Sequence, residues 1–185
     1  MNGLWVFVCG PSGAGKDSVM NWAATHMAAH QTIIFARRMV TRQSHAGSDH
    51  DEVTADQFAR LNQGGGLAWC WEAHGFSYGI DARYAEQVAA GRVVVVNGSR
   101  EHAGALEVAG HIRVLQIVAN VEQLTSRLEQ RGRDAPHEVR QRMARNERFS
   151  KLRVDHTLLN QGSLADAGRQ LVDYLVTAAA SCTTP

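Results

Sequence analysis

Lysine is almost missing from this chain of 185 residues, although its charged residues balance to a net charge of +1. Of its 19 basic residues 17 are arginine, and the only lysines are Lys16 and Lys151. So small a net charge excludes a polyelectrolyte that binds nucleic acid through its overall charge. Arginine presents a planar fork of donors that suits phosphate oxygens, whereas lysine is a compact point charge. A GC-rich genome also explains many arginines, but it does not explain where Lys16 stands.

Cysteine is scarce as well. Cys9, Cys70 and Cys182 show no paired spacing and no CxxC motif, so neither a disulfide framework nor a zinc knuckle is expected. This cysteine usage predicts a reducing, cytoplasmic location. The longest apolar run, Leu4–Cys9, is far shorter than the roughly 20 residues that cross a bilayer, and no basic stretch precedes it. We therefore expect no membrane partner and no secretory signal.

The composition, 44% hydrophobic and 20% charged residues, excludes a disordered or fibrous chain. At roughly 100–200 residues per domain, the length predicts a single domain, 1–185. Apolar runs separated by glycine breaks predict alternating strands and helices, hence an α/β fold with a mainly parallel sheet flanked by helices. The expected strands are 4–9, 32–40, 67–71, 76–78, 93–96, 113–118 and 154–159, with a loop at 43–51. The expected helices are 17–30, 55–61, 84–90, 121–130, 138–150 and 164–179.

A glycine-rich segment between the first expected strand and helix matches G-x-x-x-x-G-K, in the context that a phosphate-binding P-loop requires. Its glycines let backbone N–H groups point into one hollow, where the helix N-terminus adds partial positive charge. Lys16 would reach the β- and γ-phosphates of a nucleoside triphosphate. The alternative is a chance glycine turn, against which the strand, the spacing, the lysine and the helix all argue. The residues of the segment are Gly10, Pro11, Ser12, Gly13, Ala14, Gly15 and Lys16.

Two positions depart from the usual P-loop pattern. Asp17 follows the lysine in place of Ser or Thr, with Ser18 behind it. The strand at 93–96 runs into Asn97, where such enzymes commonly place an aspartate near the metal. Mg²⁺ prefers hard oxygen ligands, and a carboxylate moved from strand to loop would preserve the local charge. We expect Asp17 or Ser18 to contact Mg²⁺; the alternative is that Asp17 only complements the helix dipole.

A polar region precedes the strand at 93–96 and contains arginines and a tyrosine hydroxyl, which suit a second, phosphorylated substrate. Together these residues predict an acceptor pocket, although each alone also fits a solvated surface position. They are Arg37, Arg38, Thr41, Arg42, Asp49, Glu72 and Tyr78.

A denser arginine cluster lies farther along the chain, with Gly132 and Pro136 as an expected hinge. A mobile lid of this kind would close over a triphosphate, exclude water and stabilise the migrating phosphoryl group. A solvated helix face or a nucleic-acid patch is the alternative, although no aromatic residues are interleaved as stacking platforms. The arginines are Arg127, Arg131, Arg133, Arg140, Arg142, Arg145, Arg148 and Arg153.

Five segments along almost the whole chain resemble the guanylate kinase-like branch of P-loop kinases: 10–16, 39–42, 72–79, 127–133 and 159–164. Within that branch the chain looks most like the ribose 1,5-bisphosphate phosphokinases of phosphonate catabolism, through segments 15–18, 46–50 and 96–100. The resemblance implies a P-loop NTPase fold of guanylate kinase-like type. It also implies a division into a core of 1–36, 92–126 and 151–180, an acceptor-binding region of 37–91 and a lid of 127–150.

The resemblance further implies roles for single residues. Arg42 and Tyr78 align with acceptor-phosphate ligands of guanylate kinases, and Asn160 aligns with the segment near the adenine. The expected catalytic residues are Lys16, Arg133 and Arg142. The expected ATP-binding residues are those at 10–18 together with Arg131 and Asn160. The expected acceptor-binding residues are Arg38, Arg42, Glu72, Tyr78, Asn97, Ser99 and Arg100.

The implied substrate follows from one departure. Guanylate kinases read guanine with a glutamate and an acidic residue after the strong strand. Glu72 matches the first, but Asn-Gly-Ser-Arg at 97–100 replaces the acidic stretch. This loss weakens guanine recognition, and Arg100 suits a sugar bisphosphate. The resemblance thus implies an ATP- and Mg²⁺-dependent kinase that converts ribose 1,5-bisphosphate to 5-phospho-α-D-ribose 1-diphosphate.

Two alternatives stay open: a guanylate kinase that acts on GMP, and a catalytically silent binding module of the same fold. Lys16 and the arginines argue against the silent module, which has no need of them. The chemistry requires no general base, because an acceptor phosphate is already ionised near neutral pH. Alignment and charge neutralisation by Mg²⁺, Lys16 and the arginines suffice.

Overall fold

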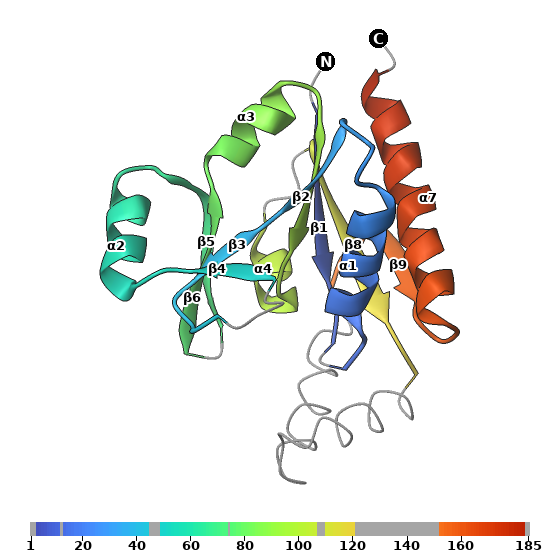
Figure 1. The fold of residues 1–185 in the computed structure, drawn as a ribbon, viewed down its shortest axis with the longest axis horizontal. Coiled ribbons are helices and arrows are strands. Elements are labelled where there is room, and N and C mark those ends of the chain that lie inside the picture. The colour runs from blue at the N-terminus through green and yellow to red at the C-terminus, as the bar shows by residue number, and fades with distance from the viewer. Residues whose placement is uncertain are drawn as a thin grey trace, which may run out of the picture.

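A five-stranded, fully parallel sheet forms the centre of the molecule (Figure 1). In spatial order its strands are β2 (Ile33–Ala36), β7 (Val93–Asn97), β1 (Leu4–Cys9), β8 (Ile112–Val118) and β9 (His156–Leu159). The computed structural model describes residues 3–11, 13–44, 49–73, 75–106, 110–120 and 152–183. Parallel strands place all their carboxyl ends at one edge, and ligands of open α/β sheets bind there.

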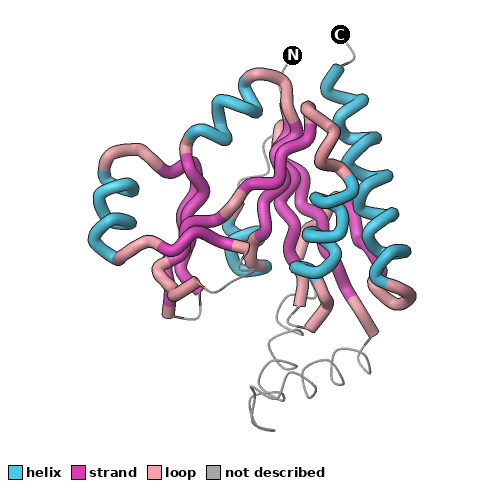
Figure 2. The backbone as a smooth tube through the Cα atoms, viewed as in Figure 1, coloured by secondary structure: helices cyan, strands magenta, loops and turns pink. Residues whose placement is uncertain are grey.

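Helices cover one face of this sheet. α1 (Lys16–His26) and α7 (Leu164–Thr183) lie side by side against it (Figures 1 and 2). Alternate side chains of β1, such as Val6 and Val8, point into the core on this side. The other set points to the opposite face, so every residue of β1 is buried. Burial on both faces explains why the central strands are continuous apolar runs.

A second sheet of four strands packs beside the central one. Its spatial order is β4 (His50–Glu52), β3 (Arg38–Val40), β6 (Phe76–Asp81) and β5 (Leu67–Ala73). β3 and β4 are parallel, whereas β6 is antiparallel to both β3 and β5. α2 (Ala55–Gln63) and α3 (Arg83–Ala89) belong to the same region, and Thr54 opens α2 with a capping box.

Aromatic side chains join the two sheets. The rings of Trp5 and Trp69 lie 4.5 Å apart, and Phe7 packs edge-on against Trp69 at 5.7 Å and Trp71 at 6.2 Å. Trp71 in turn stacks on Tyr78 at 5.5 Å. Since β1 carries Trp5 and Phe7, the strand that leads into the P-loop also anchors the second sheet.

The α/β fold with a mainly parallel sheet is confirmed, but three local expectations are wrong. The single strand expected at 32–40 breaks at Arg37, and its halves, β2 and β3, pair in different sheets. The loop expected at 43–51 ends early, because β4 begins at His50. The helix expected at 17–30 ends at His26.

A short helix, α4 (Arg100–Ala105), was not expected; Ser99 caps it. The helices expected at 121–130 and 138–150 lie outside the described residues. In the part of the chain that the structure describes, no helix is long and apolar enough to span a membrane.

Candidate active site

The P-loop connects the carboxyl end of β1 to α1, as the sequence predicts. Gly13 and Gly15 have φ angles of 87° and 77°, a left-handed conformation that favours glycine. A Cβ at Gly10 would lie 2.2 Å from the carbonyl oxygen of Ile117, so only glycine fits beside β8. α1 then begins at Lys16, and its first N–H groups are available to an anion.

Asn160, directly after β9, contacts the backbone of the P-loop. Its side chain is buried, and its Nδ2 donates a hydrogen bond of 2.7 Å to the carbonyl oxygen of Ala14. Within the loop, the N–H of Ala14 donates to the carbonyl of Pro11 at 3.2 Å. Asn160 therefore fixes the shape of the loop, and its expected position near the adenine stays a separate prediction.

The ammonium of Lys16 points toward the end of β7. Its Nζ donates to Oδ1 of Asn97 and, at 2.9 Å, to Oδ1 of Asp17. The Lys16 side chain is only 15% exposed, and burial lowers its pKa, although the Asp17 carboxylate acts in the opposite direction. Burial would raise the pKa of Asp17, but the Lys16 ammonium and a hydrogen bond from Asn97 hold it well below its usual range. Asp17 is therefore ionised at neutral pH.

Asn97 extends this arrangement to the second sheet. Its Nδ2 donates to Oδ1 of Asp17 at 2.9 Å and to Oδ2 of Asp49 at 2.8 Å. The same Asp49 oxygen accepts a hydrogen bond from Nη2 of Arg38. We call Lys16, Asp17, Arg38, Asp49 and Asn97 the bridging network. It links the P-loop, the edge of the central sheet and the second sheet.

Aromatic rings support the arginines expected to bind the acceptor. The guanidinium of Arg38 lies 5.7 Å from the ring centre of Tyr78, which is itself stacked on Trp71. The guanidinium of Arg42 lies 6.0 Å from the ring centre of Phe76. Arg38 and Tyr78 thus come together on the second sheet, and Arg42 follows two residues after the end of β3. Within the described residues Nε of Arg38 is buried and has no hydrogen-bond partner, which leaves a donor for a ligand.

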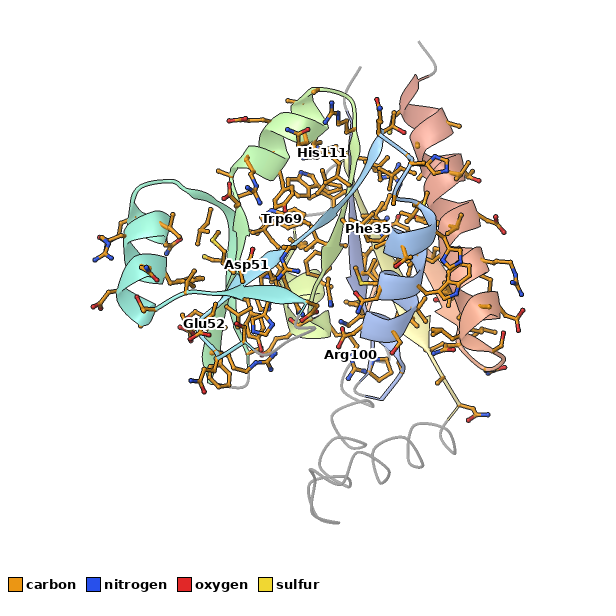
Figure 3. All side chains as sticks on the ribbon, viewed as in Figure 1. Phe35, Asp51, Glu52, Trp69, Arg100 and His111 are labelled. Atoms are coloured by element: carbon orange, nitrogen blue, oxygen red, sulfur yellow. The ribbon has the colours of Figure 1, made fainter. Side chains whose placement is uncertain are left out.

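The remaining predicted residues differ in exposure and in role. Glu72 is exposed near the end of β5, and Ser18 is exposed in the first turn of α1. The hydroxyl of Ser99 accepts the N–H of His102 at 3.0 Å, which caps α4. Arg100 begins α4 and is only 8% exposed, a buried cation rather than a surface arginine (Figure 3). Ser12 and the lid arginines Arg131, Arg133 and Arg142 lie outside the described residues.

Arg100 lies close enough to Cys9 for its charge to act on the thiol. Burial raises the pKa of Cys9 to about 11, and the charges of Arg100 and Lys16 oppose that rise without cancelling it. Cys9 is fully buried at the end of β1. It is a small core residue with no thiolate character at neutral pH.

Curated relatives match nearly the whole chain, whereas no family model matches it. The chain is 39% identical over 176 residues to the ribose 1,5-bisphosphate phosphokinase PhnN of Rhizobium etli, covering 94% of this chain and 89% of that protein. It is 43% identical over 175 residues to the enzyme of the same name from Burkholderia pseudomallei, covering 92% of this chain and 94% of that protein. The chain belongs to the ribose 1,5-bisphosphate phosphokinase family.

A solved structure supports the fold of this family member. The guanylate kinase from Anaplasma phagocytophilum superposes with a TM-score of 0.71, covering 99% of this chain and 88% of that chain. With 17% sequence identity this likeness shows the fold alone. It confirms the guanylate kinase-like fold, and the curated relatives confirm the kinase family that the sequence resembles.

A metal ion would find few protein ligands here. Among the described residues, no group of three or more His, Cys, Asp and Glu side chains could hold a metal ion. Asp17 nevertheless offers an ionised, half-exposed carboxylate beside the P-loop. Mg²⁺ in kinases is usually held by one or two carboxylates together with substrate phosphates and water, so this donor set fits Mg²⁺.

Asp49, expected in the acceptor pocket, lies beside His50, for which the sequence predicts no individual role. His50 is buried, its Nδ1 lies 3.3 Å from Oδ1 of Asp49, and its Nε2 has no hydrogen-bond partner among the described residues. An Asp-His pair in a polar loop has no periodicity to distinguish it. The only signal was the missing carboxylate at Asn97, whose amide needs an acceptor on its second side.

Proposed function

We propose that this chain phosphorylates ribose 1,5-bisphosphate with ATP, giving 5-phospho-α-D-ribose 1-diphosphate and ADP. Membership of the ribose 1,5-bisphosphate phosphokinase family carries this proposal, through relatives that match more than nine-tenths of the chain. The arrangement of Lys16 opposite Arg38 supports it, because a kinase must hold two phosphorylated substrates face to face.

ATP would bind along residues 10–18, with its phosphates on the P-loop N–H groups and its γ-phosphate beside Lys16. The acceptor's 1-phosphate would bind near Arg38, Arg42 and Tyr78. A 1-phosphate oxygen attacks the γ-phosphorus, a new P–O bond forms, and the bond from the γ-phosphorus to the bridging oxygen of ADP breaks. The attacking oxygen is already ionised, so no residue has to remove a proton. Lys16 would stabilise the charge that develops in the transition state.

Asp17 or Ser18 would hold Mg²⁺. When bound, Mg²⁺ neutralises charge on the β- and γ-phosphates. The lowered pKa of Asp17 supports its role, because the carboxylate is ionised at neutral pH. The lid arginines Arg131, Arg133 and Arg142 would complete the site.

We also propose the division into a core of 1–36, 92–126 and 151–180, an acceptor-binding region of 37–91 and a lid of 127–150. The sheets support the first boundary. All strands of the central sheet fall within the proposed core, and all strands of the second sheet fall within 37–91.

A comparison of acceptors tests the function. ADP release is measured with ATP and Mg²⁺ in the presence of ribose 1,5-bisphosphate, GMP, or no acceptor. We expect release that depends on the sugar bisphosphate far more than on GMP, because Asn-Gly-Ser-Arg at 97–100 replaces the acidic stretch with which guanylate kinases read guanine. Rapid turnover of GMP alone would make the chain a guanylate kinase. Binding of ATP without turnover of either acceptor would favour the silent module.

A further inference from the structure

Asp49 connects the second sheet to Asn97 at the end of β7, and Asn97 in turn contacts Lys16 at the end of the P-loop. Asp49 lies immediately before β4, where β4 pairs with β3 and places His50 opposite Arg38. The P-loop and Asn97, by contrast, belong to the central sheet. The Asp49 side chain is 21% exposed, so its charge is screened much less than that of a surface carboxylate.

One oxygen of Asp49 holds two donors from different sheets. Its Oδ2 accepts Nδ2 of Asn97 at 2.8 Å and also accepts Nη2 of Arg38. Its other oxygen, Oδ1, lies 3.3 Å from Nδ1 of His50. Arg38 contacts the proposed acceptor site, whereas Asn97 contacts Lys16 at the proposed ATP site. Asp49 therefore contacts one residue of the proposed acceptor site, Arg38, and one residue that contacts the proposed ATP site, Asn97.

The two carboxylates also fix which way the Asn97 amide faces. Its Nδ2 lies between the oxygens of Asp17 and Asp49, and of the two ends of the amide only the NH2 group can donate to both carboxylates. Its Oδ1 must then face Nζ of Lys16, which donates to it. Removing Asp49 removes one of the two acceptors that hold this orientation.

We propose that Asp49 is a positioning residue that couples the acceptor-binding sheet to the P-loop lysine, by holding Arg38 and Asn97 through one carboxylate oxygen. The proposal rests on the proposed function for the identity of the acceptor only. Because the same oxygen holds both donors, a substitution of Asp49 should alter the binding of both substrates, although Asp49 belongs to the proposed acceptor region.

Asp49→Ala and Asp49→Asn test this coupling, with Asp51→Ala as the matched control. Asp51 lies on β4 (Figure 3). It pairs with Arg37 at 2.8 Å, and both side chains are about half exposed. Asp49→Ala should lower kcat about 10- to 100-fold, by analogy with the loss of a hydrogen-bond partner that orients a metal ligand. It should also raise the acceptor KM and weaken ADP binding without acceptor, measured by calorimetry. Asp49→Asn keeps one oxygen for both donors and should lose less, whereas Asp51→Ala should change none of these.

A double-mutant cycle separates coupling from independent effects. ADP affinity is measured for Asp49→Ala, Asn97→Ala and the double variant, with melting temperatures to verify folding. The double variant should lose no more ADP affinity than the single variant that binds ADP less tightly. This is because both changes break the same connection, from Asp49 through Asn97 to Lys16. Additive losses would overturn the proposal, as would an Asp49→Asn or Asp49→Ala protein that changes the acceptor KM alone. These ADP affinities need no acceptor, so they decide the role of Asp49 even if ribose 1,5-bisphosphate is not turned over.

Discussion

The inner strands of the two sheets differ in how deeply they are buried. Every residue of β1 and of β7 is buried, whereas β6, an inner strand of the second sheet, is fully buried only at Tyr78, Gly79 and Ile80. The P-loop follows β1, packs against β8 at Gly10 and accepts a hydrogen bond from Asn160. The second sheet carries the proposed acceptor residues Arg38 and Tyr78. We infer that the sheet that carries the P-loop tolerates substitutions less well than the sheet that carries the proposed acceptor residues.

The largest effect is expected at the P-loop. Lys16→Ala should lower kcat roughly 10²–10³-fold, the scale for removing one preorganised electrostatic donor. Its melting temperature should stay near that of the unchanged protein, because burial already disfavours the Lys16 ammonium, as its lowered pKa indicates. Steady-state kinetics and a thermal melt measure both, with the exposed Arg92→Ala as a control. A folded Lys16→Ala protein with near-full rate would remove Lys16 from catalysis.

A leucine-to-alanine substitution should lower the free energy of unfolding more in the central sheet than in the second sheet. Leu115→Ala removes a fully buried side chain from β8 and should cost about 2–5 kcal/mol of unfolding free energy. Leu67→Ala, in the half-buried start of β5, should cost about 1 kcal/mol. Urea unfolding of both variants measures the difference. Equal losses would contradict the contrast between the sheets.

Arg38→Ala tests whether a residue of the second sheet acts on the acceptor more than on ATP. Its guanidinium is held by Asp49 and lies over Tyr78, with a buried Nε available to a ligand. Loss of a charge-assisted contact to a phosphate should raise the acceptor KM about tenfold. The KM for ATP should change less. If both constants rise equally, Arg38 contacts the transferring phosphoryl group instead of the acceptor.

Asp17→Asn should produce the smallest effect, a several-fold rise in the Mg²⁺ concentration that gives half-maximal rate. An unchanged Mg²⁺ titration would remove Asp17 from the metal site. The acid limb of stability provides an independent check. The folded pKa of Asp17 lies below its unfolded value of about 3.9. Its contribution to stability is therefore present above that pH and is lost as the pH falls further. Asp17→Asn should flatten this part of the pH profile.

The order of elements and the P-loop could be predicted because both depend on local pattern. The run at 93–96 is buried on both faces, and the glycine spacing of 10–16 has one structural context. The break at Arg37 was not visible, since β2 and β3 read as one β-branched segment and only pairing partners separate them. The bridging network was not visible for a similar reason. Asp17, Asp49 and Asn97 are far apart in the sequence, and their hydrogen bonds depend on how two sheets pack.

The product itself provides the most direct test of the proposed phosphotransfer. Phosphorus NMR of a reaction with ATP, Mg²⁺ and ribose 1,5-bisphosphate distinguishes the possible products. We expect a new pair of coupled phosphorus signals from a diphosphate on C1, in equal amount to the ADP formed, with the 5-phosphate signal retained. Consumption of ATP without that coupled pair, or a diphosphate formed at the 5-position, would contradict the account.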